Sequence, residues 1–376
     1  MTSVEITQVS TKKGWIDFGI GQPDVDLLPL AQLAKAAAHR FELKDRNILQ
    51  YGNQQGSGDF RISLASFLGE QYGETVDPDE LFVTAGISQA LDLICALHTR
   101  PGDTVIVEEP SYFLALRIFA DYKLNIIGTP IDENGLIINA LEEKLAEYNP
   151  VFIYTIPTFH NPAGVTLPVG RRKELVRLSD KYDFLIVADE VYQMLYYASK
   201  PPLPMAYYDA SDRVISLGSF SKILAPGLRL GWMHARPSLL EPFISCGYLD
   251  SGGGLNPFVS SIVSSLIELD QQKEYLNFLK QTYRIRMTTL TQALRKHIPA
   301  LQFTDPQGGY FIWSCLPEGT DTEILLAAAR KHKVGFQTGI RFSSAKGLRN
   351  HLRFCFAFYG EEQLLKGVER LSRIIR

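Results

Sequence analysis

The sequence predicts an α/β protein in which a doubly wound, mostly parallel sheet of seven strands forms a large domain beside a smaller α+β domain. Two observations carry this prediction. Short apolar runs rich in β-branched and aromatic residues alternate with helical patterns through the middle of the chain. From about Pro257 onward the pattern changes to long amphipathic helices, followed by a compact region with few strands.

Seven runs account for the predicted sheet: Leu81–Val83, Thr104–Val107, Leu124–Ile127, Val151–Ile156, Phe184–Ala188, Val214–Leu217 and Leu228–His234. Between them, Ser88–Leu97 and Val169–Tyr182 show helical spacing with one apolar face, entered through Gly or Pro. Sheets of this kind bind ligands beyond the carboxyl ends of their strands. The residues that follow each strand are therefore the first candidates for a site.

The smaller domain is expected to contain the helices after Pro257 and two strands, Phe303–Trp313 and Leu352–Phe356. We expect the first forty or so residues to join it, because they precede the alternating pattern. The predicted division gives residues 44–256 to the large domain, and residues 1–43 with 257–376 to the small domain.

The composition limits the classes of protein to which this chain could belong. With 45% apolar and 21% charged residues among 376, the chain is not expected to be disordered, and a net charge of −3 predicts no general attraction to nucleic acid or to an anionic membrane. The four cysteines are scattered without a C-x-x-C pair, so neither a disulfide framework nor a metal site is expected. No signal-peptide pattern or membrane-length apolar run is present, which predicts a cytoplasmic protein.

The segment from Gly218 to Trp232 is the most informative part of the chain. Lys222 follows an apolar run, where a partly desolvated amine could form a Schiff base with an aldehyde. Ser219 and Ser221 offer hydroxyl donors and Arg229 a guanidinium, which are suitable partners for a phosphate. The segment therefore favours pyridoxal phosphate, an aldehyde cofactor that carries a phosphate.

The same residues permit one other interpretation. Ser219 to Lys222 also spells the S-x-x-K motif of serine acyltransferases related to penicillin-binding proteins. That class requires further motifs, and neither Ser-x-Asn nor Lys-Thr-Gly follows in the chain. We therefore rank this alternative well below the cofactor interpretation.

Two other strand ends carry features that are weak when taken alone. After the first run, a glycine turn at Gly86 opens a helix at Ser88, and free amides with a hydroxyl at a helix start form an anion site. After the second run comes Tyr112, which could stack on a planar ring, although simple packing is nearly as expected.

The ends of the Val151–Ile156 and Phe184–Ala188 runs add an amide and an acid. Asn161 lies in a rigid Asn-Pro turn, and the neighbouring His160 has no second histidine nearby that would indicate a metal. Asp189 ends a very apolar run, where a carboxylate needs a cationic or donor partner. A protonated pyridine nitrogen would be such a partner.

Taken in order, these motifs resemble a known family. Asn161-Pro-x-Gly, Asp189-x-x-Tyr192, Ser219-x-Ser-Lys222 and Arg229 are similar to the class I/II aminotransferases, pyridoxal-phosphate enzymes of fold type I. The resemblance runs from Asp17 to Phe354. The step from Lys222 to Arg229 looks most like the 2-aminoadipate, kynurenine and valine-pyruvate branch.

The resemblance implies a role for each matching residue at the cofactor ring. Lys222 would form the Schiff base and then carry the proton between the substrate α-carbon and the cofactor. Asp189 would pair with the pyridine nitrogen. Tyr192 and Asn161 would hydrogen-bond the phenolic oxygen of the ring, and Tyr112 would stack on its face.

It also implies the phosphate and substrate contacts. The phosphate would be held by Ser88, the amide of Ile87, Ser219, Ser221 and Arg229. Tyr51 would reach the phosphate of a neighbouring subunit, which implies a homodimer with shared sites. Arg353 would clamp the substrate α-carboxylate, and the backbone of Gly21 and the side chain of Asn161 would lie close to it.

Two departures from the family pattern leave questions. Ile87 replaces a small or polar residue often found beside Ser88, so only its amide can serve the phosphate. Gln337-Thr-Gly339 stands where many relatives have a Pro-Gly turn, which puts the local loop and the substrate pocket in doubt.

The resulting expectation is an aminotransferase that exchanges an amino group between an L-amino acid and a 2-oxo acid by a ping-pong mechanism. A pyridoxal-phosphate-dependent C-S lyase or cyclase is the main alternative, because the same residues serve several outcomes. A ligand-sensing regulator with an aminotransferase-like domain is less expected, since the chain shows no basic recognition helix.

Overall fold

The computed structural model describes residues 8–9 and 12–375. The first part of the predicted small domain, residues 1–7 with 10 and 11, lies outside the described residues, as does residue 376. Within the described ranges, no helix is both long enough and apolar enough to cross a membrane.

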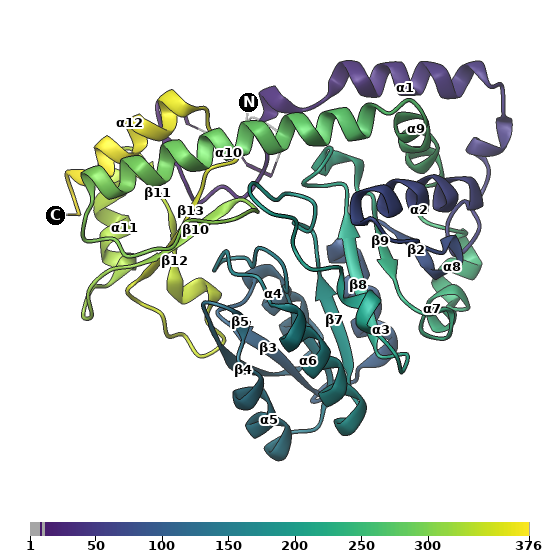
Figure 1. Cartoon of the computed structure of the whole chain (residues 1–376), viewed down its shortest axis with the longest axis horizontal. Coiled ribbons are helices and arrows are strands. Elements are labelled where there is room, and N and C mark those ends of the chain that lie inside the picture. The colour runs from purple at the N-terminus through teal and green to yellow at the C-terminus, as the bar shows by residue number, and fades with distance from the viewer. Residues whose placement is uncertain (1–7, 10–11, 376) are drawn as a thin grey trace, which may run out of the picture.

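A central sheet of eight strands organises the larger part of the chain (Figure 1). Five neighbouring strands (β8, β7, β6, β3 and β4) run parallel, whereas β2, β9 and β5 pair antiparallel with their neighbours. In spatial order the strands are β2 (Leu81–Thr84), β9 (Gly231–His234), β8 (Val214–Ser219), β7 (Leu185–Asp189), β6 (Pro150–Thr155), β3 (Thr104–Glu109), β4 (Asn125–Asp132) and β5 (Gly135–Leu136). The mostly parallel α/β sheet is confirmed, with β5 as a short additional strand that the sequence did not predict.

These strands form because both of their faces are buried. Along β3, Val105 and Val107 pack on one side of the sheet and Ile106 on the other, and β7 repeats this alternation with Val187 and Ile186. Strands buried on both faces read as continuous apolar runs, which is why the sequence revealed them.

Helices cover the two faces of this sheet. α3, α4 and α7 pack on one face, and α5 and α6 pack on the other. The helices of this part are α2 (Gly58–Tyr72), α3 (Ile87–His98), α4 (Phe113–Asp121), α5 (Ile138–Glu147), α6 (Val169–Tyr182), α7 (Pro237–Ile244) and α8 (Gly247–Gly252), with the short 3-10 turns η2 (Arg46–Leu49), η3 (Pro78–Glu80), η4 (Met205–Tyr208) and η5 (Pro226–Leu228).

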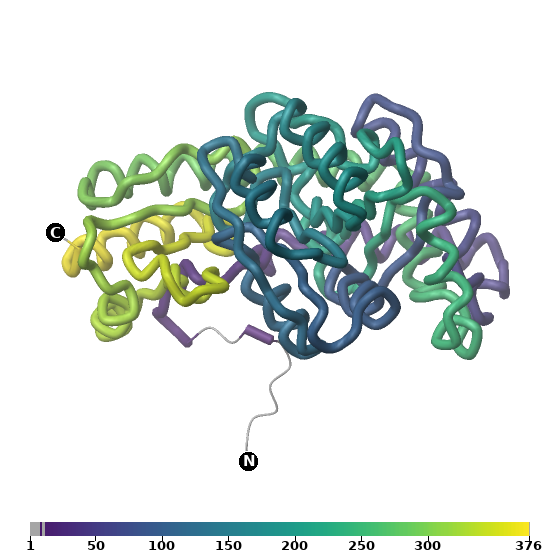
Figure 2. Tube along the Cα trace, turned by 90° about the horizontal axis from the view of Figure 1, so that it is seen from below, coloured from purple at the N-terminus to yellow at the C-terminus, as the bar shows by residue number. Residues whose placement is uncertain are grey.

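The rest of the described chain lies beside this sheet, as Figures 1 and 2 both show. A three-stranded antiparallel sheet, in the order β10, β13, β12, and a parallel pair of β1 with β11 lie at one end of it, whereas α1 packs on α9 and α9 packs on helix α2 of the larger part (Figure 1). Its elements are β1 (Ile16–Asp17), η1 (Val25–Leu27), α1 (Leu30–Glu42), α9 (Pro257–Glu268), α10 (Gln271–His297), β10 (Phe311–Cys315), α11 (Thr322–Lys331), β11 (Val334–Gly335), β12 (Gln337–Thr338), η6 (Gly339–Phe342), β13 (His351–Cys355) and α12 (Glu361–Ser372).

Two segments far apart in sequence meet in this second part. β1 pairs with β11, so that Ile16 lies opposite Val334. Arg286 of the long helix α10 donates from Nη2 to Asp24 at 2.7 Å and from Nη1 to the carbonyl of Ala357 at 2.8 Å. The N-terminal segment is thereby held against the last third of the chain. The boundaries of the two predicted domains stay a prediction.

Two strand predictions were wrong at their starts. The strand expected over Phe303–Trp313 begins only at Phe311, because the chain bends at Gln307, Gly309 and Tyr310, and Gly309 is left-handed (φ 73°). The run expected from Leu228 becomes a strand only at Gly231, because Leu228 is still the last residue of η5 and Arg229 adopts a left-handed conformation with φ 47°.

Arg172 anchors helix α6 to the turns after two strands. Its guanidinium is fully buried, and it donates to the carbonyls of Pro157 (2.7 Å) and Leu203 (3.0 Å) and to Thr158 Oγ1 (2.8 Å). It also lies 3.4 Å from Glu190 Oε1, next to the end of β7. A buried charge of this kind is tolerated because each donor has a partner.

We predict that Arg172→Leu lowers the free energy of unfolding by about 3–5 kcal/mol, because it leaves the buried Glu190 carboxylate without its cation. Urea unfolding followed by circular dichroism measures the change. The matched control is Arg177→Leu on the same helix, whose exposed pair with Glu174 contributes less than about 1 kcal/mol. Equal effects of the two variants would contradict this assignment.

Candidate active site

The neighbouring parallel strands β6, β7 and β8 place their carboxyl ends at the same edge of the large sheet. Asn161 lies in the turn after β6, Asp189 is the last residue of β7, and Ser219 is the last residue of β8. Lys222 follows three residues later. The predicted site residues of these three segments therefore lie at the same edge of the sheet, as expected from the sequence.

Lys222 is half-buried as a residue, and its amine is desolvated among contacts with two other parts of the chain. Its Nζ donates to the carbonyl of Gly21 at 2.8 Å and lies 5.4 Å from the ring centroid of Tyr310. The hydroxyl of Tyr310 donates to the Lys222 carbonyl at 2.9 Å. Burial lowers the pKa of the Lys222 amine to about 8. An amine of this kind is neutral often enough near pH 7 to bond an aldehyde.

Asp189 is a buried carboxylate with too few partners for its charge. Tyr154 donates its hydroxyl to Oδ2 at 2.8 Å, and the amide of Val191 lies 3.4 Å from Oδ1. Asp189 forms no ion pair within the described residues, and burial raises its pKa to about 6. A cationic donor at this point would lower the pKa again, because it would favour the charged carboxylate.

The segment after β8 forms a corner rich in hydrogen-bond donors. Ser219 donates from Oγ to Ser221 Oγ at 2.9 Å, and Arg229 Nη1 lies 3.4 Å from the same Ser221 oxygen. Arg229 also approaches Gly86 closely: a Cβ on this glycine would lie 2.6 Å from Nη2. Two hydroxyls and a guanidinium thus converge beside a backbone that carries no side chain.

The start of helix α3 completes this corner. Gly86 has a φ of 86°, which favours glycine, and Ile87 and Ser88 form the first turn of the helix. The first amides of a helix have no partner within it and attract anions. The corner therefore suits a phosphate monoester.

Arg353 occupies a buried position between the two sheets. Its Nη1 donates to Asn161 Oδ1 at 2.8 Å and its Nη2 to the carbonyl of Gly19 at 3.0 Å. The guanidinium carbon lies 3.9 Å from the ring centroid of Phe311. Its Nε is buried without a hydrogen-bond partner within the described residues. Arg353 is therefore a buried cation with donor capacity to spare, which suits a carboxylate ligand.

Gly21 lies between the two cations of the site. Its carbonyl accepts from Lys222, and a Cβ on it would lie 3.3 Å from Nη2 of Arg353. A side chain here would crowd the arginine, so the glycine keeps the space between Lys222 and Arg353 open.

The predicted tyrosines take different positions. Tyr192 is buried, with its ring 5.4 Å from that of Tyr310 and 5.8 Å from that of Phe311. Burial, and then the negative charge of Asp189, raise the pKa of Tyr112 to about 12. Tyr51 is 83% exposed and lies outside this group.

Sequence reasoning missed a buried polar cluster behind the site. Glu108 accepts hydrogen bonds from Thr155 Oγ1 (2.9 Å) and from the amide of Ile156 (2.7 Å), and His160 Nε2 lies 3.1 Å from it. The amide of Ala163 donates to Nδ1 of this histidine, which places the ring proton on Nε2, facing Glu108. His160 thus fixes the turn that carries Asn161.

Tyr154, the partner of Asp189, was also missed. It lies inside strand β6, where the sequence shows only an apolar run. A hydroxyl on a fully buried strand residue was the one signal that could have indicated a polar partner across the sheet.

The donor set of this site fits pyridoxal phosphate. Its requirements are an amine for the aldehyde, an acid for the ring nitrogen, an anion corner for the phosphate and a cation for the substrate carboxylate. The amine is that of Lys222, and the acid is Asp189, which has few partners of its own. The anion corner lies at Arg229, and the cation is Arg353, whose Nε has no partner within the described residues.

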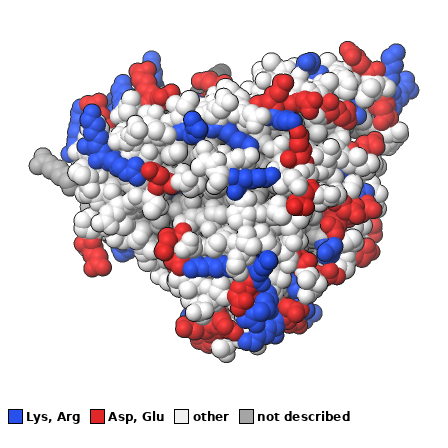
Figure 3. Space-filling view, in the orientation of Figure 1, with Lys and Arg blue, Asp and Glu red and all other residues white. Residues whose placement is uncertain are grey.

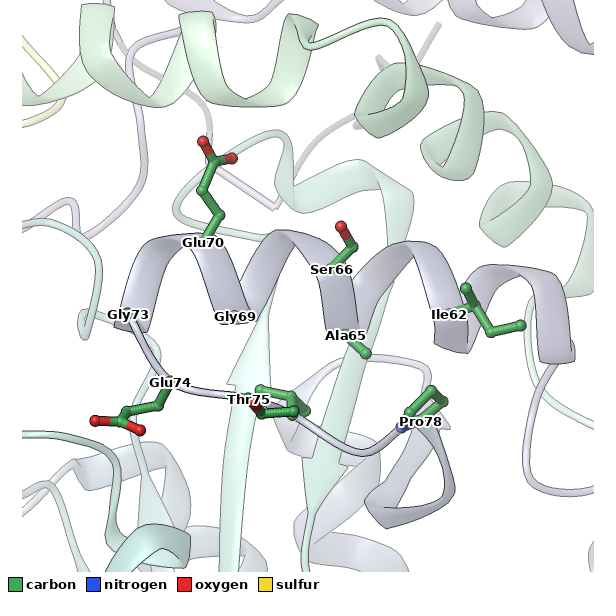
Figure 4. Close-up of a pocket in the computed structure, with 10 residues that line it drawn as sticks. Ile62, Ala65, Ser66, Gly69, Glu70, Gly73, Glu74, Thr75 and Pro78 are labelled. Carbon is green, nitrogen blue, oxygen red and sulfur yellow. The ribbon is translucent and has the colours of Figure 1, made fainter.

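Two surface features lie apart from this set. Basic and acidic side chains are interspersed over the face in Figure 3, in keeping with the small net charge. An open pocket of about 580 Å³ lies between helix α2 and the following segment (Figure 4). Its lining runs from Ile62 to Pro78 and includes none of the predicted site residues.

Comparison with known proteins identifies the family. The sequence model for "Aminotransferase class I and II" matches residues 13–371. The chain is 35% identical to aromatic-amino-acid aminotransferase 1 of Thermococcus litoralis over 95% of this chain and 87% of that protein.

Solved structures agree with this match. A multiple substrate aminotransferase from Thermococcus profundus superposes with a TM-score of 0.90 at 34% identity, covering 97% of this chain and 92% of that one. An α-aminoadipate aminotransferase from Thermus thermophilus, complexed with N-(5′-phosphopyridoxyl)-L-leucine, gives a TM-score of 0.86 at 32% identity over 96% and 92% of the two chains. The chain therefore belongs to the class I and II aminotransferases of fold type I, which are pyridoxal-phosphate-dependent transaminases.

Proposed function

We propose that this transaminase works by a ping-pong mechanism in which Lys222 binds the cofactor covalently and moves the proton. An L-amino acid first leaves its amino group on the enzyme, and a 2-oxo acid then takes it away. The observation that carries the proposal is the buried Lys222 amine, with its pKa lowered to about 8, between Gly21 and the Tyr310 ring.

Bound pyridoxal phosphate supplies an aldehyde that bonds amines and a ring that takes up the electron pair released at the substrate α-carbon. The protein would do the rest. The free Nζ of Lys222 would remove a proton from the substrate α-carbon and later return it. Asp189 would pair with the ring nitrogen, and Tyr192 and Asn161 would hydrogen-bond the ring oxygen. Tyr112 would lie against the ring.

Substrate orientation would rest on Arg353. Its guanidinium binds the α-carboxylate as a planar fork, with the Gly21 backbone and Asn161 alongside. The phosphate would be held by Ser88, the Ile87 amide, Ser219, Ser221 and Arg229.

We further propose a homodimer in the cytoplasm. Tyr51, 83% exposed in the single chain, would reach the phosphate site of the neighbouring subunit. Its backbone neighbour Gly52 forms a bridge with Gly254, which fixes the position of this tyrosine on the surface. The division into a large and a small domain would then separate a cofactor-binding part from one that contributes Arg353.

A single half-reaction tests the function. We expect the holoenzyme, mixed with an L-amino acid alone, to release one equivalent of 2-oxo acid per site and no ammonia, and a second 2-oxo acid to restore the starting absorbance. Lys222→Ala should slow this step at least roughly 100-fold, because it removes the group that moves the proton. The control Lys173→Ala, an exposed residue of α6, should keep the full rate. Ammonia release instead would indicate a lyase.

The lowered pKa of Lys222 gives a pH prediction. Only the neutral amine reacts with electrophiles. The rate at which a small amine-reactive electrophile modifies Lys222 in the apoprotein should therefore rise about tenfold per pH unit below pH 7 and level off above pH 9. The midpoint is expected near pH 8 rather than near the ordinary 10.5. Peptide mass spectrometry of timed samples measures it, and a midpoint above 10 would contradict a buried, desolvated amine.

Arg353→Ala is expected to lower kcat/KM for amino acids roughly 100-fold, because the variant loses the buried cation that partners the substrate α-carboxylate. The cofactor is expected to stay bound. Steady-state kinetics and the visible absorbance of the holoenzyme give the two readouts. Arg349→Ala, which removes an exposed arginine of the same region, serves as the control. Loss of the cofactor from the Arg353 variant would show that this residue does not act on the substrate.

A further inference from the structure

Tyr310 contacts the backbone of the turn that carries Lys222. Its hydroxyl donates to the carbonyl of Lys222 at 2.9 Å, and the buried Gln272 of α10 donates from Nε2 to the next carbonyl, that of Ile223, at 2.9 Å. The amide of Phe356, just after β13, donates to the carbonyl of Tyr310 at 3.1 Å. The turn after β8 is therefore fixed by side chains that come from the second part of the chain.

The ring of Tyr310 is fixed by other rings. Its centroid lies 5.4 Å from that of Tyr192 and 5.0 Å from that of Tyr283. Tyr310 is fully buried, and burial raises the pKa of its hydroxyl well above the ordinary value, so the side chain carries no charge. Because packing holds the ring, we expect it to keep its place when the hydroxyl is removed.

The same ring lies beside the amine of Lys222. Nζ is 5.4 Å from the ring centroid, within the range in which the electron-rich face of an aromatic ring attracts a cation. On another side, the carbonyl of Gly21 accepts from Nζ at 2.8 Å. Neither group is charged, and both stabilise the ammonium form of Lys222 more than its neutral form.

The ionisable groups around Lys222 act on its charge in both directions. Burial opposes the positive charge most strongly, and the guanidinium groups of Arg353 and Arg229 also lower the pKa of the amine. Cys355 and Asp189 act in the opposite direction, and Asp189 is expected to pair with the cofactor once it is bound. A positive charge formed on Lys222 therefore depends on uncharged neighbours as well.

We propose that Tyr310 is a positioning residue for the proton transfer, whose ring holds the ammonium of Lys222 between its taking the proton from the substrate α-carbon and its giving the proton back. During that interval the proton is bonded to the lone pair of Nζ, and the amine carries a charge away from water. A ring stabilises this charge but cannot accept the proton, which stays available for return. The inference rests on the proposed function, because it needs Lys222 to be the group that moves the proton.

The test changes the electrons of the ring and keeps its shape. Tyr310→Phe retains the ring, whereas pentafluorophenylalanine at the same position has an electron-poor face that no longer attracts a cation. In each apoprotein, trace acetylation of Lys222 with acetic anhydride across a pH series, followed by peptide mass spectrometry, gives the midpoint of its titration. We expect the Phe variant to keep a midpoint near pH 8. The fluorinated ring should lower it by about half to one pH unit, or roughly three- to tenfold weaker proton binding.

The holoenzyme gives a second readout. With a saturating L-amino acid alone, the fluorinated ring should slow the release of 2-oxo acid roughly three- to tenfold relative to the Phe variant. The amino-acid concentration at half-maximal rate should change less than about twofold, because Arg353 and not Lys222 is expected to bind the substrate.

The control places the same two residues at position 275. Tyr275 is a buried tyrosine of α10 whose hydroxyl donates to the carbonyl of Leu27 at 2.9 Å. Neither readout should differ there between phenylalanine and its fluorinated form. Equal midpoints for the two residues at position 310, or a higher midpoint with the fluorinated ring, would overturn the role of Tyr310 while transamination stands. If the wild-type enzyme converts no L-amino acid to its 2-oxo acid, the proposed function fails and the role in proton transfer fails with it.

Discussion

The active site depends on how the buried guanidinium of Arg353 is partnered. Asn161 from the end of β6, Gly19 from the N-terminal segment and the Phe311 ring from the small sheet all contact it. A buried charge needs partners of this kind because it has lost its contacts with water. Each group that contacts the guanidinium is held in place by that contact. Three segments distant in sequence are therefore held in register at the place where the substrate carboxylate is expected to bind.

Burial shifts the pKa values of Asp189 and Lys222, the two ionisable groups at the expected cofactor position, in opposite directions from their ordinary values. Burial raises the pKa of Asp189 to about 6 and lowers that of Lys222 to about 8, so each charged form is disfavoured. A ligand that gives the carboxylate a cationic neighbour and takes the amine into a bond relieves both. Any such ligand also stabilises the folded chain, because it binds only the folded state.

Much of the fold could be predicted from sequence because the strands are buried on both faces and read as apolar runs. The site residues Asn161, Asp189 and Lys222 could be predicted because they follow such runs. Glu108 and Tyr154 could not, because their partners lie on neighbouring strands and sequence does not show which strands adjoin. The false start at Phe303 has a local cause: the chain bends at Gln307, Gly309 and Tyr310 before the strand begins, and Gly309 is left-handed.

The pairing of β1 with β11 has a consequence for synthesis. Residues 16 and 17 find their strand partners only at residues 334 and 335, so the carbonyls of Gly19 and Gly21 cannot take their final places until most of the chain has left the ribosome. The large sheet, complete by residue 234, can form earlier, since domains generally fold in order of synthesis. The amine of Lys222 would then remain exposed to water while the later segments are made. The burial that lowers its pKa would arise only in the last stage of translation.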